Sequence, residues 1–157
     1  MIVFHSSTCI VEHPDVSFSR DYLDFGKGFY VTTIEEQARK YAQRFLLRGK
    51  KAYLNKYELS DDLREYKTLS FDSYDESWLD FVAICRVGKD CTDYDMDLGG
   101  IANDKVFRTI DLFFSGEITK DETLRNLLYE KPNDQICLRS QHLLDTELTF
   151  ISSEEIR

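Results

Sequence analysis

The sequence predicts an α+β fold: a single domain spanning residues 1–157, with a split, mixed β-sheet core and helices inserted between the strands. Three observations predict it. Short apolar or alternating runs, typical of strands, are separated by longer segments with apolar residues at helical spacing. No Pro-, Gly- or Ser-rich linker divides the chain. Its length and its 42% hydrophobic content suit one substantial core.

The strands are predicted from short apolar runs that end at polar or glycine residues. Residues 2–4 are apolar and lead into His5, so we expect a buried strand that presents His5 at its end. Residues 10–23 include Pro14 and many short polar side chains, and are expected to form an irregular loop. Further strands are predicted at residues 28–32, 52–59, 68–71, 135–138 and 148–151.

The first helix is predicted from Thr33 onwards. Thr33 and Glu36 have the spacing of a capping box, and Gly49 is placed to end the helix. The apolar residues between these ends recur on one helical face: Ile34, Ala38, Tyr41, Ala42, Phe45 and Leu46.

Three more helices are expected further along the chain. One covers residues 78–85, where apolar residues recur at helical spacing. Asn103 is placed to cap the next. Thr119 and Glu122 have the spacing of another capping box, ahead of the last.

Composition argues against several classes of protein. The net charge of −9 opposes broad attraction to nucleic acid or anionic lipid, while leaving room for a local basic patch. Since no apolar run reaches 18 residues and the first residues lack a signal-peptide pattern, we expect a cytoplasmic protein without a membrane span. The four cysteines form no C-x-x-C pair and are expected to be free thiols: Cys9, Cys85, Cys91 and Cys137.

One tract is concentrated in positive charge, and it falls on the first predicted helix and just after it. On a helix, most of these side chains are expected to form a solvated polar face. The tract comprises Arg39, Lys40, Arg44, Arg48, Lys50 and Lys51.

The glycine-rich stretch DFGKGFYVTT, residues 24–33, was compared with phosphate-binding loops. A dinucleotide fingerprint needs a third glycine where Val31 stands, and a P-loop needs Gly-Lys-Ser/Thr entering a helix. Here Gly26-Lys27-Gly28 enters a predicted strand. Both phosphate-loop interpretations fail, which leaves a glycine bend before a strand.

The acidic run at residues 93–97 was compared with a calcium loop. An EF-hand has glycine at its sixth position, where this chain has Leu98, and it prefers glutamate at its twelfth, where this chain has Asp104. We therefore predict a solvated acidic loop and no metal site.

Three separated segments match the motifs of one enzyme family. Residues 4–7, Phe-His-Ser-Ser, are similar to a His-Gly-Ser strand end, and residues 26–30, Gly-Lys-Gly-Phe-Tyr, to a Gly-x-Gly-Ile-Tyr strand. A second family tyrosine lies eleven residues after the first, as Tyr41 does after Tyr30. Residues 133–138, Asn-Asp-Gln-Ile-Cys-Leu, are similar to the strand that carries the catalytic glutamate. The chain thus resembles ADP-ribosyltransferases of the diphtheria-toxin and poly(ADP-ribose)-polymerase type.

Nearly the whole chain also resembles a bacterial family with this transferase fold. Members of that family have an H-x-S strand, a DFGKGFY-like strand, a WLDFV helix, an AND segment and a closing NDQI. The corresponding residues here are 5–7, 24–30, 78–82, 102–104 and 133–136.

The resemblance implies a binding site for NAD, which serves as a substrate. It places His5 against the adenosine-side ribose and the backbone of Ser6 against the nicotinamide amide. It places Tyr30 and Tyr41 on either side of the nicotinamide ring, with Gly28 letting the chain pass close beneath that ring. It also places Asn103, in the AND segment, at the cofactor site.

Two departures from the family pattern affect the expected chemistry. Ala38 stands where the family has a serine or threonine that binds the amide. At the glutamate position, a gap-free match gives Asp134, while the strand pattern points Gln135 inward. Gln135 can position a ribose hydroxyl but cannot accept a proton, so Asp134 is kept as the candidate base. Tyr30, Asp134 and Gln135 are the candidate catalytic residues.

The resemblance therefore predicts transfer of a single ADP-ribose rather than polymer synthesis, to a protein or nucleic-acid acceptor that the sequence does not name. The role expected with it is a bacterial toxin or defence effector, with room for a neutralising partner protein. The alternative is an inactive module of the same fold that binds NAD or a partner protein, which the missing glutamate and Ala38 favour.

Overall fold

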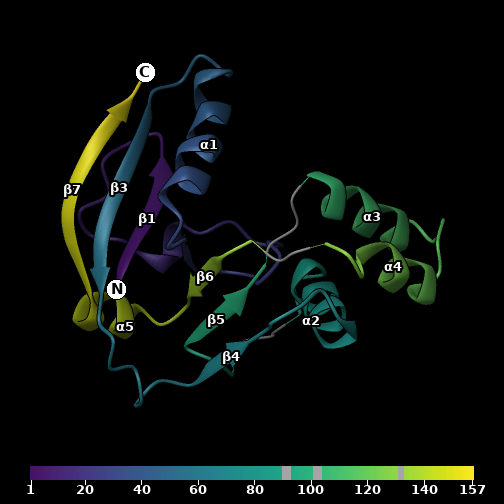
Figure 1. The fold of residues 1–157 in the computed structure, drawn as a ribbon. Coiled ribbons are helices and arrows are strands. Elements are labelled where there is room, and N and C mark those ends of the chain that lie inside the picture. Colours follow the sequence, from purple (N-terminus) through teal and green to yellow (C-terminus); the bar gives the residue numbers. More distant parts are fainter. Residues whose placement is uncertain (90–92, 101–103, 131–132) are drawn as a thin grey trace.

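The computed structural model describes the chain except for residues 90–92, 101–103 and 131–132 and the side chain of Asp104. It is an α+β structure with two β-sheets and helices on their flanks (Figure 1). The first sheet has the strand order β1-β3-β7 and is antiparallel throughout. Its strands are β1 (Ile2–Ser7), β3 (Ala52–Leu59) and β7 (Leu148–Ile156).

The second sheet has the order β2-β6-β5-β4, in which β4 and β5 are parallel and the other pairs antiparallel. Its strands are β2 (Phe29–Val31), β6 (Gln135–Leu138), β5 (Met96–Gly99) and β4 (Thr68–Ser70). Among the described residues, one isolated bridge, Phe4 to Thr32, links the two sheets where β1 passes the end of β2.

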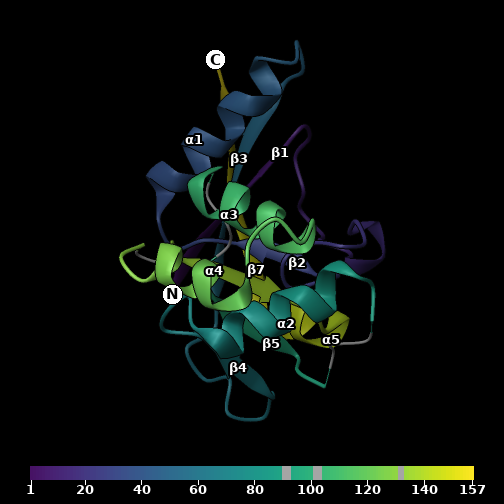
Figure 2. The same ribbon diagram turned by 90° about the vertical axis from the view of Figure 1, so that its right-hand side faces the viewer.

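The helices divide between the two sheets. Helix α1 (Glu35–Leu46) packs on β1 and β3, while α2 (Glu76–Arg86) lies beside the second sheet with α3 (Asp104–Phe114) and α4 (Lys120–Leu127) (Figures 1 and 2). A short 3-10 turn (Val16–Phe18) and α5 (Gln141–Glu147) complete the described elements.

Three apolar clusters form the core. The largest contains buried residues of both sheets, with Val3 and Leu59 from the first and Val31 and Ile136 from the second. A second cluster surrounds Trp78 and joins α2, α3 and α4 to the outer face of the second sheet. The third lies between α1 and the first sheet: Phe4, Ala38, Ala42, Ala52, Leu54 and Ile156.

Several predicted elements are confirmed and others differ. The predicted strands at 52–59 and 135–138 are confirmed, and so is the Thr119–Glu122 capping box of α4. Strand β1 continues past His5 to Ser7 because its whole length pairs with β3, so His5 lies within the strand. Strand β7 likewise continues to Ile156, through two Ser and two Glu residues that alternate between its two sides, because it pairs with β3 along this length.

The capping box predicted at Thr33 and Glu36 is wrong. Helix α1 begins at Glu35, and its N-cap residue, Ile34, makes no side-chain capping bond. Thr33 instead donates hydrogen bonds from both its backbone N–H and its hydroxyl to Asp134. A carboxylate that lies just before the distant strand β6 has replaced the local partner.

The solvated acidic loop predicted at residues 93–97 is also wrong in part. Met96 and Asp97 belong to strand β5, and Asp97 is fully buried. The expectation of four free thiols fails too, because Cys85 is disulfide-bonded, whereas Cys9 and Cys137 are free. None of the helices in the described ranges combines the length and apolar character that a membrane span requires.

Candidate functional site

His5 is held in a defined orientation at the junction of the two sheets. Its Nδ1 lies 2.7 Å from the carbonyl oxygen of Tyr30 and therefore donates to it, while the imidazole packs against Phe29 at 4.3 Å between ring centroids. Burial lowers the pKa of His5, so the ring is neutral at pH 7. With the proton on Nδ1, Nε2 is an acceptor that can bind a hydroxyl group.

Ser6 is tied to helix α1. Its hydroxyl donates to the carbonyl oxygen of Ala38 at 2.6 Å, across the interface between β1 and the helix. The bond fixes α1 against the strand that carries His5.

Tyr30 turns its side chain away from His5 and into the second core cluster. Its hydroxyl donates to the carbonyl of Gly26 at 2.6 Å and accepts from the N–H of Phe25 at 3.2 Å. Burial raises the pKa of Tyr30 far above its usual range, so the phenol stays neutral. The hydroxyl is therefore engaged within the protein, and the ring packs against the second core cluster rather than beside His5.

Gly28 has a structural reason to be glycine. A Cβ at this position would lie 2.4 Å from the sulfur of Cys137 and 3.0 Å from the carbonyl oxygen of Leu138. The chain passes close to β6 at this point. The structure therefore explains Gly28 by the close approach of its backbone to strand β6, whereas the resemblance explained it by a nicotinamide ring.

Tyr41 lies on the side of α1 rather than beneath it. Its side chain is 39% exposed and meets Phe45 edge-on at 5.7 Å, and the guanidinium of Arg44 lies 5.3 Å from its ring centroid. The residues of α1 that are fully buried against the sheet are Ala38 and Ala42. Tyr41 therefore offers an accessible aromatic ring, supported on one side.

The start of β6 is joined to the start of α1. The carboxylate of Asp134 accepts from Thr33, and the side-chain amide of Gln37 donates to the carbonyl of Asp134 at 2.9 Å. Gln135, the next residue, is buried at the start of the strand. Since Gln37 and Tyr41 are four residues apart on the helix, Tyr41 lies on the flank of α1 that faces this strand end.

The structure thus brings together four of the predicted segments: β1 with His5, β2 with Tyr30, the start of α1 and the start of β6. No ring contact joins Tyr30 and Tyr41 among the described residues. Asn103, which the sequence placed at the same site, lies outside the described residues.

Sequence reasoning missed a buried ion pair on the same sheet. Arg139 donates from Nε to Asp97, and its other nitrogens donate to the carbonyl oxygens of Phe25 and Lys27. Arg139, just after β6, thus connects Asp97 of β5 to the turn that leads into β2. The signal available in the sequence was the alternation Gln135, Cys137, Arg139, which places Arg139 on one face of the strand.

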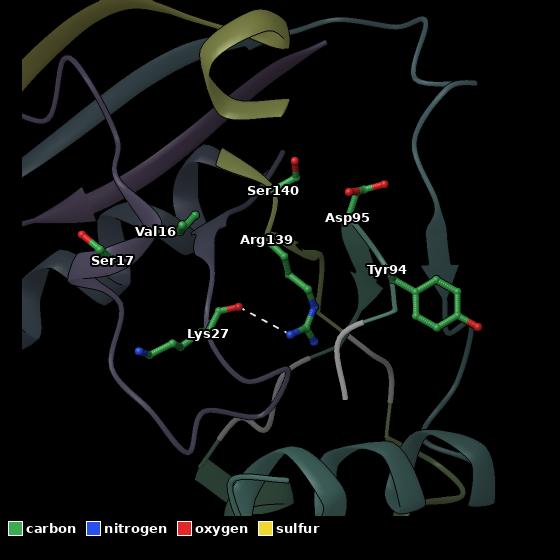
Figure 3. Close-up of a pocket in the computed structure, with 7 residues that line it drawn as sticks. All are labelled: Val16, Ser17, Lys27, Tyr94, Asp95, Arg139 and Ser140. Atoms are coloured by element: carbon green, nitrogen blue, oxygen red, sulfur yellow. Dashed lines mark hydrogen bonds between the residues drawn. The ribbon is translucent and has the colours of Figure 1, made fainter. Parts of the chain in front are cut away.

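An open pocket of about 520 Å³ lies beyond the other end of β6 (Figure 3). Figure 3 shows Arg139 at its centre, bonded to the carbonyl of Lys27, with the side chain of Lys27 directed away from Tyr94. Arg139 and Gln135 stand at opposite ends of the strand, so this pocket is separate from the site around α1. Its lining residues are Val16, Ser17, Lys27, Tyr94, Asp95, Arg139 and Ser140.

Comparison with known proteins identifies the family. A family model described as a protein of unknown function, DUF3990, matches residues 1–150. The chain belongs to the DUF3990 family. The match covers every strand of both sheets except the end of β7, and thus every residue of the site in this DUF3990 protein. A search of curated proteins found no significant match.

Proposed function

We propose that the protein is a mono-ADP-ribosyltransferase, which transfers one ADP-ribose from NAD to a protein or nucleic-acid acceptor. One observation carries the proposal: the candidate segments, far apart in the sequence, are hydrogen-bonded to one another around the start of α1. His5 donates to the carbonyl of Tyr30, and Gln37 donates to that of Asp134. Holding NAD for this reaction requires such a fixed set of groups from several elements.

The transfer exchanges one bond at the ribose for another. The bond between C1′ of the ribose and the nicotinamide nitrogen breaks, and its electron pair leaves with nicotinamide. C1′ then bonds to an oxygen or nitrogen of the acceptor, whose proton passes to solvent. The positive charge that develops on the ribose must be stabilised by the site.

Each described candidate has a chemical role consistent with this reaction. The free Nε2 of neutral His5 accepts a hydrogen bond from a ribose hydroxyl. The exposed ring of Tyr41 stacks on nicotinamide. The amide of Gln135, at the start of β6, positions the ribose next to nicotinamide, whereas His5 binds the adenosine-side ribose. As an effector of this kind the protein would act in the cytoplasm as a toxin or defence factor, restrained by a neutralising partner.

A second candidate function is an inactive module that binds NAD without turnover. The observation that favours it is the engagement of Asp134: its carboxylate already accepts two hydrogen bonds from Thr33, which holds it at the helix start. Gln135 cannot take a proton. Thr33 thus fixes the carboxylate of Asp134 at the start of α1, where it supports the structure as well as being a candidate base.

Binding and turnover are measured separately to test the proposal. We expect NAD to raise the melting temperature of the protein, and Tyr41→Ala to remove most of this stabilisation, because the ring that stacks on nicotinamide is lost. The matched control is Leu47→Ala, just beyond the end of α1, where the side chain is 87% exposed. This variant is expected to respond to NAD as the wild type does.

Turnover is measured in two ways: as release of nicotinamide, and as transfer of label from NAD to components of a cell lysate. The transferase proposal predicts both nicotinamide release and label transfer, and both rates should be lower in Tyr41→Ala than in the wild type. Stabilisation by NAD without either product would support the inactive module. A folded protein that neither binds NAD nor releases nicotinamide would exclude both functions.

A further inference from the structure

Gln37 lies on helix α1 between two parts of the candidate site and contacts one of them directly. Its side-chain Nε2 donates to the backbone carbonyl of Asp134 at 2.9 Å, although the two residues are 97 positions apart in the chain. Four residues later on the same helix stands Tyr41, whose ring is 39% exposed. The side chain of Gln37 therefore joins the segment before β6 to the flank of α1 that carries the candidate stacking ring.

The contact with Asp134 determines which way the amide of Gln37 faces. A backbone carbonyl oxygen only accepts hydrogen bonds, so the group that faces it is the NH2 of the amide and not the oxygen. The amide oxygen, Oε1, is then on the other branch of the planar group. Within the described residues, no donor contacts this oxygen. Gln37 is thus held by its nitrogen and presents an unused acceptor.

The direction of helical side chains brings the ring of Tyr41 toward this acceptor. Residues four apart on a helix have Cβ atoms about 5–6 Å apart, and long side chains lean toward the N-terminus of the helix. The ring contacts agree with this lean, since Phe45 of the following turn meets the ring of Tyr41 edge-on at 5.7 Å. The preceding turn holds Gln37 and Ala38. A ligand ring stacked on Tyr41 therefore has one edge beside the amide of Gln37.

The neighbouring groups do not offer the same acceptor. Ala38, on the same turn as Gln37, has no polar side-chain atom and is almost fully buried, and its backbone carbonyl accepts from the hydroxyl of Ser6 at 2.6 Å. The hydroxyl of Tyr30 is bonded to two backbone groups of the turn before β2. Oε1 of Gln37 is therefore the unused neutral side-chain acceptor on this turn of α1.

This acceptor matches one group of the proposed ligand. Nicotinamide carries a carboxamide on its ring, with two N–H donors and one carbonyl acceptor. When the ring stacks on a side chain, these donors lose contact with water and need acceptors from the protein. A ketone at the same ring position has no N–H to donate, and it would leave Oε1 of Gln37 unpaired.

We propose that Gln37 is a specificity-determining residue, whose Oε1 accepts a hydrogen bond from the nicotinamide carboxamide of NAD. This inference rests on the proposed NAD-dependent function and names the group of the ligand that the site selects. By holding the carboxamide, Gln37 fixes the rotation of the ring over Tyr41, and with it the direction of the bond from the ring nitrogen to C1′ of the ribose. The hydrogen bond to Asp134 holds Gln37 itself in place.

Binding of two dinucleotides to the wild type tests the inference directly. One is NAD, and the other is its acetylpyridine analogue, in which a neutral methyl ketone replaces the carboxamide. Both have a carbonyl on the ring, but only NAD can donate to Oε1. Isothermal titration calorimetry should give a dissociation constant about tenfold lower for NAD, because the analogue leaves Oε1 without a donor. Equal affinities for the two dinucleotides would overturn the inference.

Gln37→Met removes the amide and keeps a side chain of similar length and helix propensity. We expect its affinity for NAD to fall about tenfold and its affinity for the analogue to stay the same, so that the preference disappears. The matched control, Gln43→Met, makes the same change at an exposed position of α1 and should keep the preference. Equal losses for both dinucleotides in Gln37→Met would indicate a structural role alone and overturn the inference.

The outcomes separate this inference from the transferase proposal. If the wild type binds NAD and Gln37→Met keeps the preference for it, the role given to Gln37 is wrong and the NAD result stands. A preference lost in Asp134→Asn but kept in Gln37→Met would assign the contact to that carboxylate and also overturn the inference. A folded wild type that binds neither dinucleotide excludes both proposals. Should Gln37→Met fail to fold, Gln37→Ala, which also lacks the amide, takes its place in the comparison.

Discussion

At the scale of single residues, the most consequential contact is the ion pair between Asp97 and Arg139. Asp97 is fully buried, and one of its oxygens, Oδ1, has no hydrogen-bond partner within the described structure. Arg139 is 5% exposed and also donates to two backbone carbonyls. Burying two charges costs free energy that their attraction only partly repays. The pair is therefore better explained as a device that fixes the turn before β2 than as a source of net stability.

This pair gives the folded protein a specific dependence on pH. Burial raises the pKa of Asp97 to about 6 from 3.8, although Arg139 opposes the shift. Between these two values the folded state binds more protons than the unfolded state, so the contribution of Asp97 to the free energy of unfolding falls as pH rises and is constant above about pH 6.

Urea unfolding of the wild type and of Asp97→Asn, followed by Trp78 fluorescence from pH 4 to 7, measures this contribution. We expect the free energy of unfolding of the wild type, relative to the variant, to decrease across this range. The opposite slope would mean that attraction to Arg139 outweighs burial.

The sequence could not identify this pair because its two members meet only through strand pairing. Asp97 stands in a run of acidic residues, which locally is typical of a solvated loop. Its burial follows from the antiparallel register of β5 and β6, which places Asp97 opposite Cys137, two residues before Arg139. Contacts of this kind depend on tertiary structure and leave no local pattern.

At the scale of elements, two sequences with the same capping-box spacing behave differently. In α4 the box forms: Glu122 accepts from the N–H of Thr119 at 2.7 Å, and Thr119 accepts from that of Glu122 at 3.1 Å. In α1 the corresponding Thr33 is bonded to Asp134. A local signal was overridden where a strand end came close enough to compete.

This difference predicts that two matched substitutions lower the free energy of unfolding by different amounts. Glu122→Ala removes a capping bond and should lower the free energy of unfolding by about 0.5–1 kcal/mol. Glu36→Ala, at the equivalent position of α1, should change it by less than about 0.5 kcal/mol. Chemical denaturation of both variants is the measurement. A larger loss for Glu36→Ala would indicate that a capping box forms at α1 in solution.

Elements with a complete local signal were predicted well, and short or polar ones were not. Apolar residues alternate along much of 52–59 and form a run at 136–138, and both strands have the predicted bounds. The strand at Met96–Gly99 was missed because half of it is Asp and Gly and it follows a run of acidic residues. Helix α5, of seven residues, was missed for a similar reason.

The candidate site shows the same limit of sequence reasoning. The motif residues His5, Tyr30, Tyr41 and Gln135 were found by their resemblance to a family. The residues that hold them in place, Thr33 and Gln37 around Asp134, were not, since their partners are about a hundred positions away in the chain.

At the scale of the whole molecule, the two sheets are joined more by their core than by their hydrogen bonds. In the part of the chain that the structure describes, one isolated bridge, Phe4 to Thr32, connects the backbones. The largest apolar cluster, by contrast, takes buried side chains from both sheets and from α5. A shared core of this kind couples the stability of one sheet to that of the other.

We therefore predict that the chain unfolds as one cooperative unit. Leu59→Ala removes a fully buried side chain of the first sheet and should lower the free energy of unfolding by about 2–5 kcal/mol. The single tryptophan, Trp78, lies in the other cluster and reports on α2 and the second sheet. Far-ultraviolet circular dichroism and Trp78 fluorescence should give the same denaturation midpoint in the wild type, and both should shift equally in the variant. If Leu59→Ala moved the circular dichroism transition while leaving that of Trp78 in place, the two sheets would be separate folding units, and the prediction of a single domain would be wrong.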